Sequence, residues 1–276
     1  MSAAMKKAAV FLWLVLLFCS TASQAADAVR VVAGTSLISD IVADLTQNRC
    51  EILTLNQGSS CPGHENASTG DYVFAARANL LLIHPFQRNL QQVSAMLAAV
   101  DNPKLKVAEV SPRNSWLIPQ VQKQAVNEIA AALEVIAPEL APAIRLRTRQ
   151  RMQRIDAAET QCRELLAPLQ GKRVIAATMQ AEFASWAGLE VVRTFGRAED
   201  INARELAEIL NAVKNIPVAG VVDNYQSGPD AGLPLALELG VAHVVLSNFP
   251  GSSDDAPDYF SLLMHNVRQL QALAKP

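Results

Sequence analysis

The stretch that decides the fold is residues 143–166, AIRLRTRQRMQRIDAAETQCRELL. Its apolar side chains recur every three to four positions, which predicts one long helix. These positions are Ile144, Met152, Ile155, Cys162 and Leu166. Pro142 stands at the start, where a missing N–H costs little, and Pro168 and Gly171 mark the end. At about 1.5 Å per residue, such a helix spans roughly 36 Å, the length of a small domain.

Arginine fills much of the rest of this helix, at positions 145, 147, 149, 151, 154 and 163. Because the apolar stripe is narrow, the helix is not expected inside a core, and the arginines are expected to form a solvated face. Short β-rich runs alternate with helical runs on both sides of it. We therefore predict an α/β protein of two lobes, joined by this helix as a strut, with the ligand cleft between them.

The residue pattern before the strut predicts four βα units, each a strand followed by a helix. Strands are expected at 29–33, 51–55, 80–83 and 106–110, and helices at 36–45, 71–77, 89–100 and 119–137. Such alternation implies a mainly parallel sheet flanked by helices, in which ligands bind beyond the carboxyl ends of the strands. His64, His84 and Asn114 all follow strand ends and are expected at one edge of this lobe.

The segment after the strut repeats the plan. Strands are expected at 172–177, 189–194, 218–222 and 244–246, and helices at 178–187, 231–239, 259–274 and after Asp200, the expected N-cap. The polar or sulfur-bearing residues at these strand ends are Thr178, Met179, Gln180, Asp223, Asn224 and Asn248. They are expected to face the first lobe across the cleft. His243 is expected just before a strand, at the far end of the sheet.

The first 25 residues have the pattern of a secretory signal peptide. Lys6 and Lys7 precede an apolar run at 8–18, and small residues at 23–25 form a cleavage site after Ala25. Cys19 follows the bulky Phe18, which favours a soluble periplasmic protein over a lipoprotein. No later segment holds 18 uninterrupted apolar residues, so no transmembrane helix is expected. The predicted division is signal peptide 1–25, first lobe 26–138, connecting helix 139–168 and second lobe 169–276.

Charge and motifs exclude several classes of function. Without Lys6 and Lys7, 22 of the 24 basic residues remain against 26 acidic ones, a net charge of −4 that makes nucleic acid an improbable partner. The chain has no GxSxG, HExxH or P-loop motif, so no enzyme is expected. The remaining cysteines, Cys50, Cys61 and Cys162, are odd in number, so at least one thiol is unpaired within the chain.

The order of these elements and three motifs resemble the zinc- and manganese-type periplasmic solute receptors of ABC importers. Residues 34–42, GTSLISDIV, are similar to the opening helix of that family, and 63–71, GHENASTGD, resemble its Pro-His-x-Tyr-Glu-Pro-Thr-Pro-x-Asp motif. The His of that motif is the family's first metal ligand and corresponds to His64. Residues 114–119, NSWLIP, resemble His-x-Trp-Leu-Asp-Pro, with Asn114 in place of the second ligand. The resemblance covers about 240 residues, including the long helix.

The resemblance also shows where this chain departs from the family. The third ligand position, a His in the family, falls near Thr178 or Met179, and the acidic fourth falls near Asp223 and Asn224 or at Asn248. Zinc prefers about four N or S donors, with carboxylate as the usual substitute, so the preserved set is incomplete. Either other residues complete the metal site, or the ligand is not the usual ion.

Cys61 is the first additional candidate ligand, because Pro62 and Gly63 favour a tight turn that aims its thiol and His64 at one point. Two alternatives stay open, a disulfide with Cys50 and an inert thiol. The strand between Cys50 and Cys61 separates them by roughly 17 Å, against less than about 7 Å between bridged Cα atoms, unless the loop folds back. His84 is a candidate ligand or a buried, hydrogen-bonded His, and Asp223 a candidate ligand or turn former. Trp116 and Tyr225 are expected to wall the cleft. Met179 and Gln180 are expected to line the pocket, with a thioether donor as the alternative role of Met179.

The resemblance implies a periplasmic receptor that captures a divalent cation, zinc first and manganese or another transition metal next. The expected metal ligands are His64, Cys61, His84 and Asp223, and the expected partners are an inner-membrane permease and its ATPase. The receptor is expected to be a monomer. The alternative is the same fold binding a metal chelate or a small organic ligand, recognised by the amides of Asn114, Gln180, Asn224 and Asn248.

Overall fold

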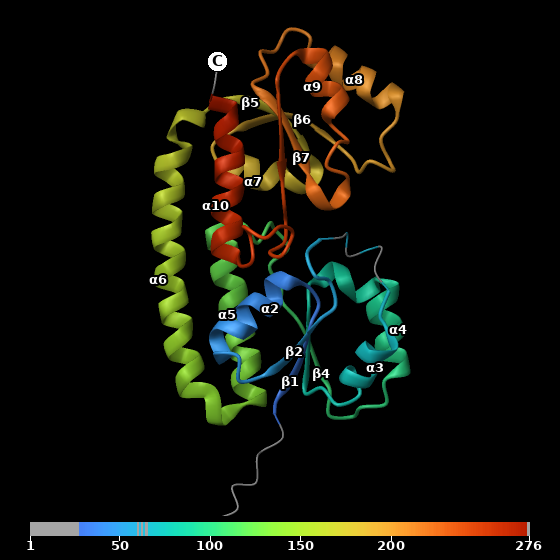
Figure 1. Cartoon of the computed structure of the whole chain (residues 1–276), viewed down its shortest axis with the longest axis vertical. Helices are drawn as coiled ribbons and strands as arrows, with labels where there is room; N and C mark the ends of the chain where they lie inside the picture. Colours follow the sequence, from blue (N-terminus) through green and yellow to red (C-terminus); the bar gives the residue numbers. More distant parts are fainter. Residues whose placement is uncertain (1–27, 60, 62, 64–65, 275–276) are drawn as a thin grey trace, which may run out of the picture.

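The computed structural model describes residues 28–59, 61, 63 and 66–274. Two α/β lobes lie one above the other, and one long helix runs beside both (Figure 1). This architecture confirms the predicted fold class. The expected signal peptide and His64 lie outside the described residues. Among the helices that are described, none is long and apolar enough to cross a membrane.

The first lobe is built on a parallel sheet with strand order β2-β1-β3-β4. Its strands are β1 (Arg30–Ala33), β2 (Glu51–Thr54), β3 (Leu80–Ile83) and β4 (Lys106–Glu109). Its helices are α2 (Ser36–Thr46), α3 (Thr69–Ala75), the 3-10 turn η1 (Pro85–Asn89), α4 (Gln91–Ala99) and α5 (Pro119–Ile136). Successive side chains of a strand point to opposite faces, so Leu80 and Leu82 join the core under α2 and α5, while Leu81 and Ile83 join the core under α3 and α4. The central strand β3, LLLI, is apolar and buried throughout because helices cover both faces of the sheet.

The second lobe repeats this topology with strand order β6-β5-β7-β8, also parallel. Its strands are β5 (Arg173–Ala177), β6 (Glu190–Phe195), β7 (Gly220–Asn224) and β8 (Ala242–Leu246). Its helices are α7 (Ala181–Trp186), α8 (Ala203–Val213), α9 (Leu233–Leu239) and α10 (Tyr259–Leu270). In both sheets the chain reverses its winding beside the first strand, at β1 and β3 and again at β5 and β7. Such a reversal leaves a crevice at the carboxyl ends of the strands.

Two local expectations for the second lobe are wrong. The N-cap of α8 is Asn202, whose Oδ1 accepts hydrogen bonds from the backbone N–H groups of Arg204 and Glu205 at 3.1 Å, and not Asp200. His243 does not precede its strand but lies inside β8, paired in register with Val221 of β7.

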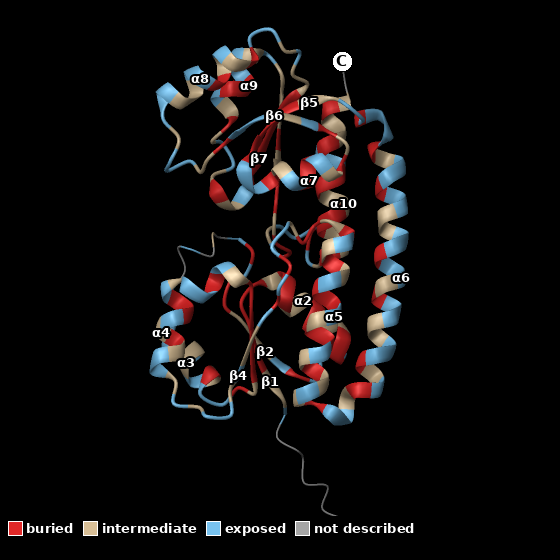
Figure 2. Cartoon of the chain, turned by 180° about the vertical axis from the view of Figure 1, so that it is seen from behind, coloured by how far each residue is buried: buried red, intermediate tan, exposed pale blue. Residues whose placement is uncertain are grey.

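The strut is α6 (Ala141–Leu166), 26 residues long. Its buried residues form a stripe, visible as red bands between exposed turns in Figure 2, and most of them join one core that continues into both lobes. Ile144 lies in the same apolar cluster as α5, and Leu166 in the same cluster as the end of the chain. The strut therefore packs along both lobes instead of linking them through solvent.

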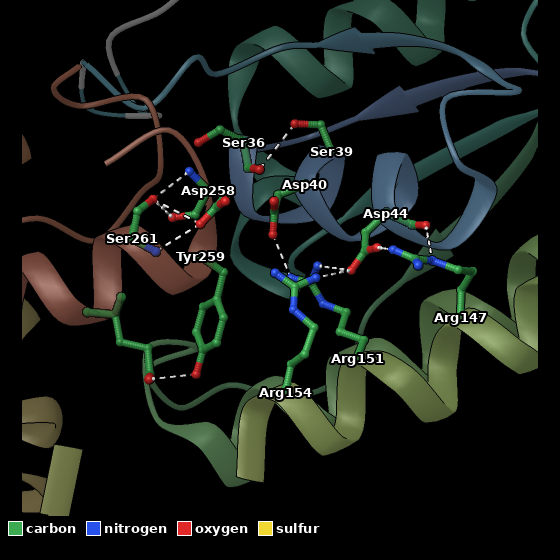
Figure 3. Close-up of polar contacts among 11 residues, drawn as sticks. Ser36, Ser39, Asp40, Asp44, Arg147, Arg151, Arg154, Asp258, Tyr259 and Ser261 are labelled. Carbon is green, nitrogen blue, oxygen red and sulfur yellow. Dashed lines mark hydrogen bonds and ion pairs between the residues drawn. The ribbon is translucent and has the colours of Figure 1, made fainter. Parts of the chain in front are cut away.

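The expectation of a solvated arginine face is wrong for the middle of α6. The side chain of Arg151 is only 1% exposed and pairs with two aspartates of α2: Nη2 lies 2.5 Å from Asp40 Oδ2 and Nη1 lies 2.8 Å from Asp44 Oδ2. Arg147 and Arg154 also pair with Asp44 (Figure 3). We call Asp40, Asp44, Arg147, Arg151 and Arg154 the strut cluster. It fastens α6 to the helix that begins at the edge of the cleft.

Candidate functional site

A cavity of about 670 Å³ lies between the two lobes, at the carboxyl edges of both sheets. The first lobe lines it with residues that follow β1, β2, β3 and β4: Leu37, Cys61, Gly63, His84, Pro85, Phe86, Leu90, Pro112, Arg113, Asn114, Ser115 and Trp116. The second lobe contributes Thr178, Met179, Glu182, Arg197, Asn224, Gln226, Ser227, Asn248 and Phe249. This size falls in the range of small-molecule sites.

Hydrogen bonds join the lobes around this cavity. Ser36 Oγ at the start of α2 donates to Pro250 O at 2.7 Å, and Gln226 Nε2 donates to Gly58 O at 2.7 Å. The Ser115 N–H donates to Glu182 Oε2, also at 2.7 Å. These contacts come from loops and helix starts at the carboxyl edges of both sheets, so the lobes meet around the cavity.

His84 lies at the end of β3 and lines the cavity. Its Nε2 is 2.9 Å from Thr35 Oγ1, the residue before α2, and its ring packs on Trp116 with centroids 4.1 Å apart. Burial lowers the pKa of His84 to about 3, because the charged imidazolium would lose its water. The ring is therefore neutral at physiological pH, the state in which imidazole binds metals.

Trp116 forms an apolar wall beside this imidazole. The side chain is buried, and its Nε1 donates to Pro112 O at 2.9 Å, which satisfies the polar end of the ring. Phe86 also stacks on His84, with ring centroids 5.2 Å apart. Met179, which is 47% exposed, faces the same cavity from the second lobe.

An amide network forms the floor on the side of the second lobe. Gln180 Nε2 donates to Asn224 Oδ1 at 2.8 Å and to Asn248 Oδ1 at 3.0 Å, and Asn248 Nδ2 donates to Asn224 Oδ1 at 2.9 Å. Asn224 and Asn248 line the cavity, while Gln180 is fully buried behind them. The network holds the two lining amides in fixed positions, and both come from adjacent strand ends as the sequence predicts.

Asp223 is not brought to the cavity. Its Oδ2 accepts a 2.7 Å hydrogen bond from the Gly232 N–H and lies 3.1 Å from His243 Nε2, and its Oδ1 accepts from the Asn224 N–H at 2.9 Å. The carboxylate is fully buried and ties β7 to β8 and to the start of α9. These contacts occupy both oxygens, so Asp223 has the structural role and the expected role as metal ligand has no support in the geometry.

The three described thiols are all free, which removes the disulfide between Cys50 and Cys61 from consideration. Cys50 is buried in the core of the first lobe, and burial raises its pKa. Cys162 is buried on α6, where burial raises its pKa to about 11. Cys61 is half-buried and lines the cavity, so it is the thiol that a bound ligand would meet.

The described residues do not assemble a complete metal shell. No group of three or more His, Cys, Asp or Glu side chains within 28–59, 61, 63 and 66–274 is arranged to hold an ion. Cys61 and His84 line the cavity, and the expected ligand His64 lies outside these ranges. Asn114 is exposed at the rim, where the family resemblance places a histidine.

The sequence analysis missed several lining residues. The sequence analysis selected Asn114 and Asn248 because they follow strand ends, a criterion that we call the strand-end rule. Arg113 precedes Asn114 and Phe249 follows Asn248, so including one more residue on each side would find both. Arg197 and Gln226 lie two or more residues beyond the ends of β6 and β7, in loops whose path the sequence does not reveal.

The comparisons with known proteins agree with this architecture. The family model described as zinc-uptake complex component A, periplasmic, matches residues 31–273. A search of curated proteins found no match.

Among solved structures, the periplasmic zinc binding protein TroA from Treponema pallidum is 16% identical, with a TM-score of 0.75 over 90% of this chain and 99% of that chain. The periplasmic metal binding protein from Candidatus Liberibacter asiaticus is 15% identical, with a TM-score of 0.74 over 90% of this chain and 100% of that chain. Its Mn-bound form covers the same shares at the same identity, with a TM-score of 0.73. At such identities the likeness establishes the fold.

Proposed function

Since the chain belongs to the family of periplasmic zinc-uptake components, we propose that it captures a metal cargo between its lobes and delivers it to an ABC permease with its ATPase. Members of this family are periplasmic metal-binding receptors of ABC transporters and not enzymes. The observation that carries the proposal is the cavity at the carboxyl edges of both sheets, which residues of both lobes line. A cargo bound there would contact both lobes at once.

Zinc is the first candidate for the cargo, and manganese or another divalent transition metal is the next. A half-buried thiol and a neutral imidazole are donors that suit zinc, and Cys61 and His84 offer them in the cavity. His64 is the third proposed ligand, on the strength of its motif. Among the relatives, TroA is named for zinc and the Liberibacter protein is named in Mn-bound and Cd-bound forms.

The remaining features of the proposal follow from the sequence. We place the mature N-terminus after Ala25 and the protein in the periplasm as a monomer. The lobes are assigned to residues 26–138 and 169–276, with the connecting helix at 139–168. The match of the family model from residue 31 onward supports a functional chain that begins after the signal peptide.

A second candidate is a small organic ligand that binds without metal. The fixed amides of Asn224 and Asn248 and the ring of Trp116 favour it, because such walls and donors are typical of organic-ligand sites. This ligand would stay bound after a chelator has removed all metal from the protein.

The test is elemental analysis of the mature protein, purified from periplasm without an affinity-tag metal. We expect close to one transition-metal ion per chain, and a loss of most of it in Cys61→Ser and in His64→Ala, because each removes a donor. His265→Ala is the matched control, since that imidazole contacts Asp255 on the surface and lies outside the cavity. Absence of metal, together with a retained organic molecule, would instead establish the second candidate.

A further inference from the structure

The cavity is larger than a bare ion needs. A metal ion with six waters fills about 200 Å³, at about 30 Å³ for each water-sized particle. The cavity volume of about 670 Å³ is more than three times that value. A cargo that fills it and touches both lobes must include more atoms than a hydrated ion.

The cavity also offers few donors for a bare ion. Within the described part of the chain, the lining holds one thiol, one imidazole and one carboxylate, those of Cys61, His84 and Glu182. Glu182 already accepts the Ser115 N–H, and these groups do not form an ion-binding cluster. A transition metal needs about four donors or more, so the described lining does not complete its coordination, and a chelator would supply the donors that are missing.

Two guanidinium groups line the cavity from opposite lobes. Arg113 follows β4 in the first lobe, and Arg197 follows β6 in the second. Arg113 makes no ion pair with a described residue, and the one ion pair of Arg197 within the described part of the chain joins its Nη1 to Glu199 Oε1, 3.7 Å away and outside the lining. With two guanidinium groups against one described carboxylate, that of Glu182, the described lining has an excess of positive charge, which repels a free dication and attracts an anion.

Resting on the proposed function, we propose that the metal enters the cavity as a complex with an anionic, carboxylate-bearing organic chelator. Arg113 and Arg197 bind its free anionic oxygens, because a planar guanidinium matches a carboxylate with two parallel hydrogen bonds. Trp116 and Phe249 pack on its apolar part, and the amide of Asn248 binds a polar group. Cys61 and His84, the ligands proposed above, complete the coordination of the metal. Because one arginine comes from each lobe, a single complex would contact both lobes at once.

The proposal is tested by titrating the metal-free protein with three probes at equal total zinc: zinc sulfate, the anionic zinc citrate complex and the neutral bis-histidine complex of zinc. We expect zinc citrate to bind at least tenfold more tightly than either other probe. A charge-assisted hydrogen bond contributes about 10- to 100-fold in affinity, so Arg113→Gln and Arg197→Gln should each weaken citrate-complex binding by about that factor. Arg193→Gln on β6 is the matched control, because that arginine is exposed, bonds its neighbour Val192 O and lies outside the cavity.

Each outcome decides between the two proposals. Tight binding of zinc sulfate, unchanged or strengthened in the arginine variants, would overturn the chelate and leave the metal-receptor function intact. Equal binding of the anionic and neutral complexes would also overturn it, because charge would then play no part. If none of the probes binds to folded wild-type protein, the receptor function fails together with the chelate.

Discussion

Replacing Arg151 with Ala should lower the free energy of unfolding by about 3–5 kcal/mol, the loss expected when one partner of a buried ion pair is removed. The guanidinium is 1% exposed and holds two carboxylates of α2. Asp44 would keep Arg147 and Arg154, but Arg151 is the one described hydrogen-bond partner of the Asp40 carboxylate, which is 15% exposed. The substitution therefore leaves the Asp40 carboxylate without this partner and with little access to water. Urea unfolding followed by circular dichroism measures the change.

Two variants bracket this result. Arg204→Ala on α8 breaks an ion pair whose side chains are 89% and 65% exposed, so it should cost less than about 1 kcal/mol. Arg151→Met combined with Asp40→Leu removes the stranded charge together with its partner and should recover most of the stability. An Arg151→Ala protein within 1 kcal/mol of wild type would show that α6 does not depend on the strut cluster.

Trp116→Ala should cost about 3–5 kcal/mol of stability, because it empties the volume of a large side chain that is 4% exposed. The indole also covers His84, with ring centroids 4.1 Å apart, so its loss opens the imidazole to water and widens the cavity. Binding of the cargo should weaken along with stability. Thermal unfolding with and without cargo separates the two effects.

Trp186→Ala is the matched control for the indole. Trp186 lies on α7, only half-buried, where it packs on Phe183 and under the guanidinium of Arg163, away from the cavity. It should cost less stability than Trp116→Ala and leave cargo affinity unchanged. Equal losses of affinity in both variants would mean that the wall beside His84 has no special role.

The fold could be predicted because its determinants are local. Each strand is a short apolar run, and each prediction lies within two residues of the observed bounds, as with β3 at Leu80–Ile83. The long helix follows from the spacing of Ile144, Ile155 and Leu166. The burial of Arg151 could not be predicted, because the aspartates that it pairs with lie more than 100 positions earlier and no local pattern links them.

The candidate site could be predicted in part for a related reason. The strand-end rule brings His84, Asn114 and Asn248 to one cavity because parallel strands all point their carboxyl ends to the same edge. The rule does not tell a lining carboxylate from a structural one: Asp223 also stands at a strand end, yet the backbone of Gly232 and the ring of His243 hold it away from the cavity. The rule also does not predict where residues of longer loops lie, such as Arg197 in the loop after β6.

The central claim, a metal cargo held between the lobes, is tested most directly by anomalous X-ray diffraction from crystals of the protein purified with its natural cargo. Data collected above and below the absorption edge of the metal found by elemental analysis locate the ion without assumptions. We predict one peak inside the cavity, about 2.3 Å from Cys61 Sγ if the metal is zinc, with organic density beside it that reaches Arg113 and Arg197. A peak on the surface, or an occupied cavity that contains no anomalous scatterer, would contradict the account.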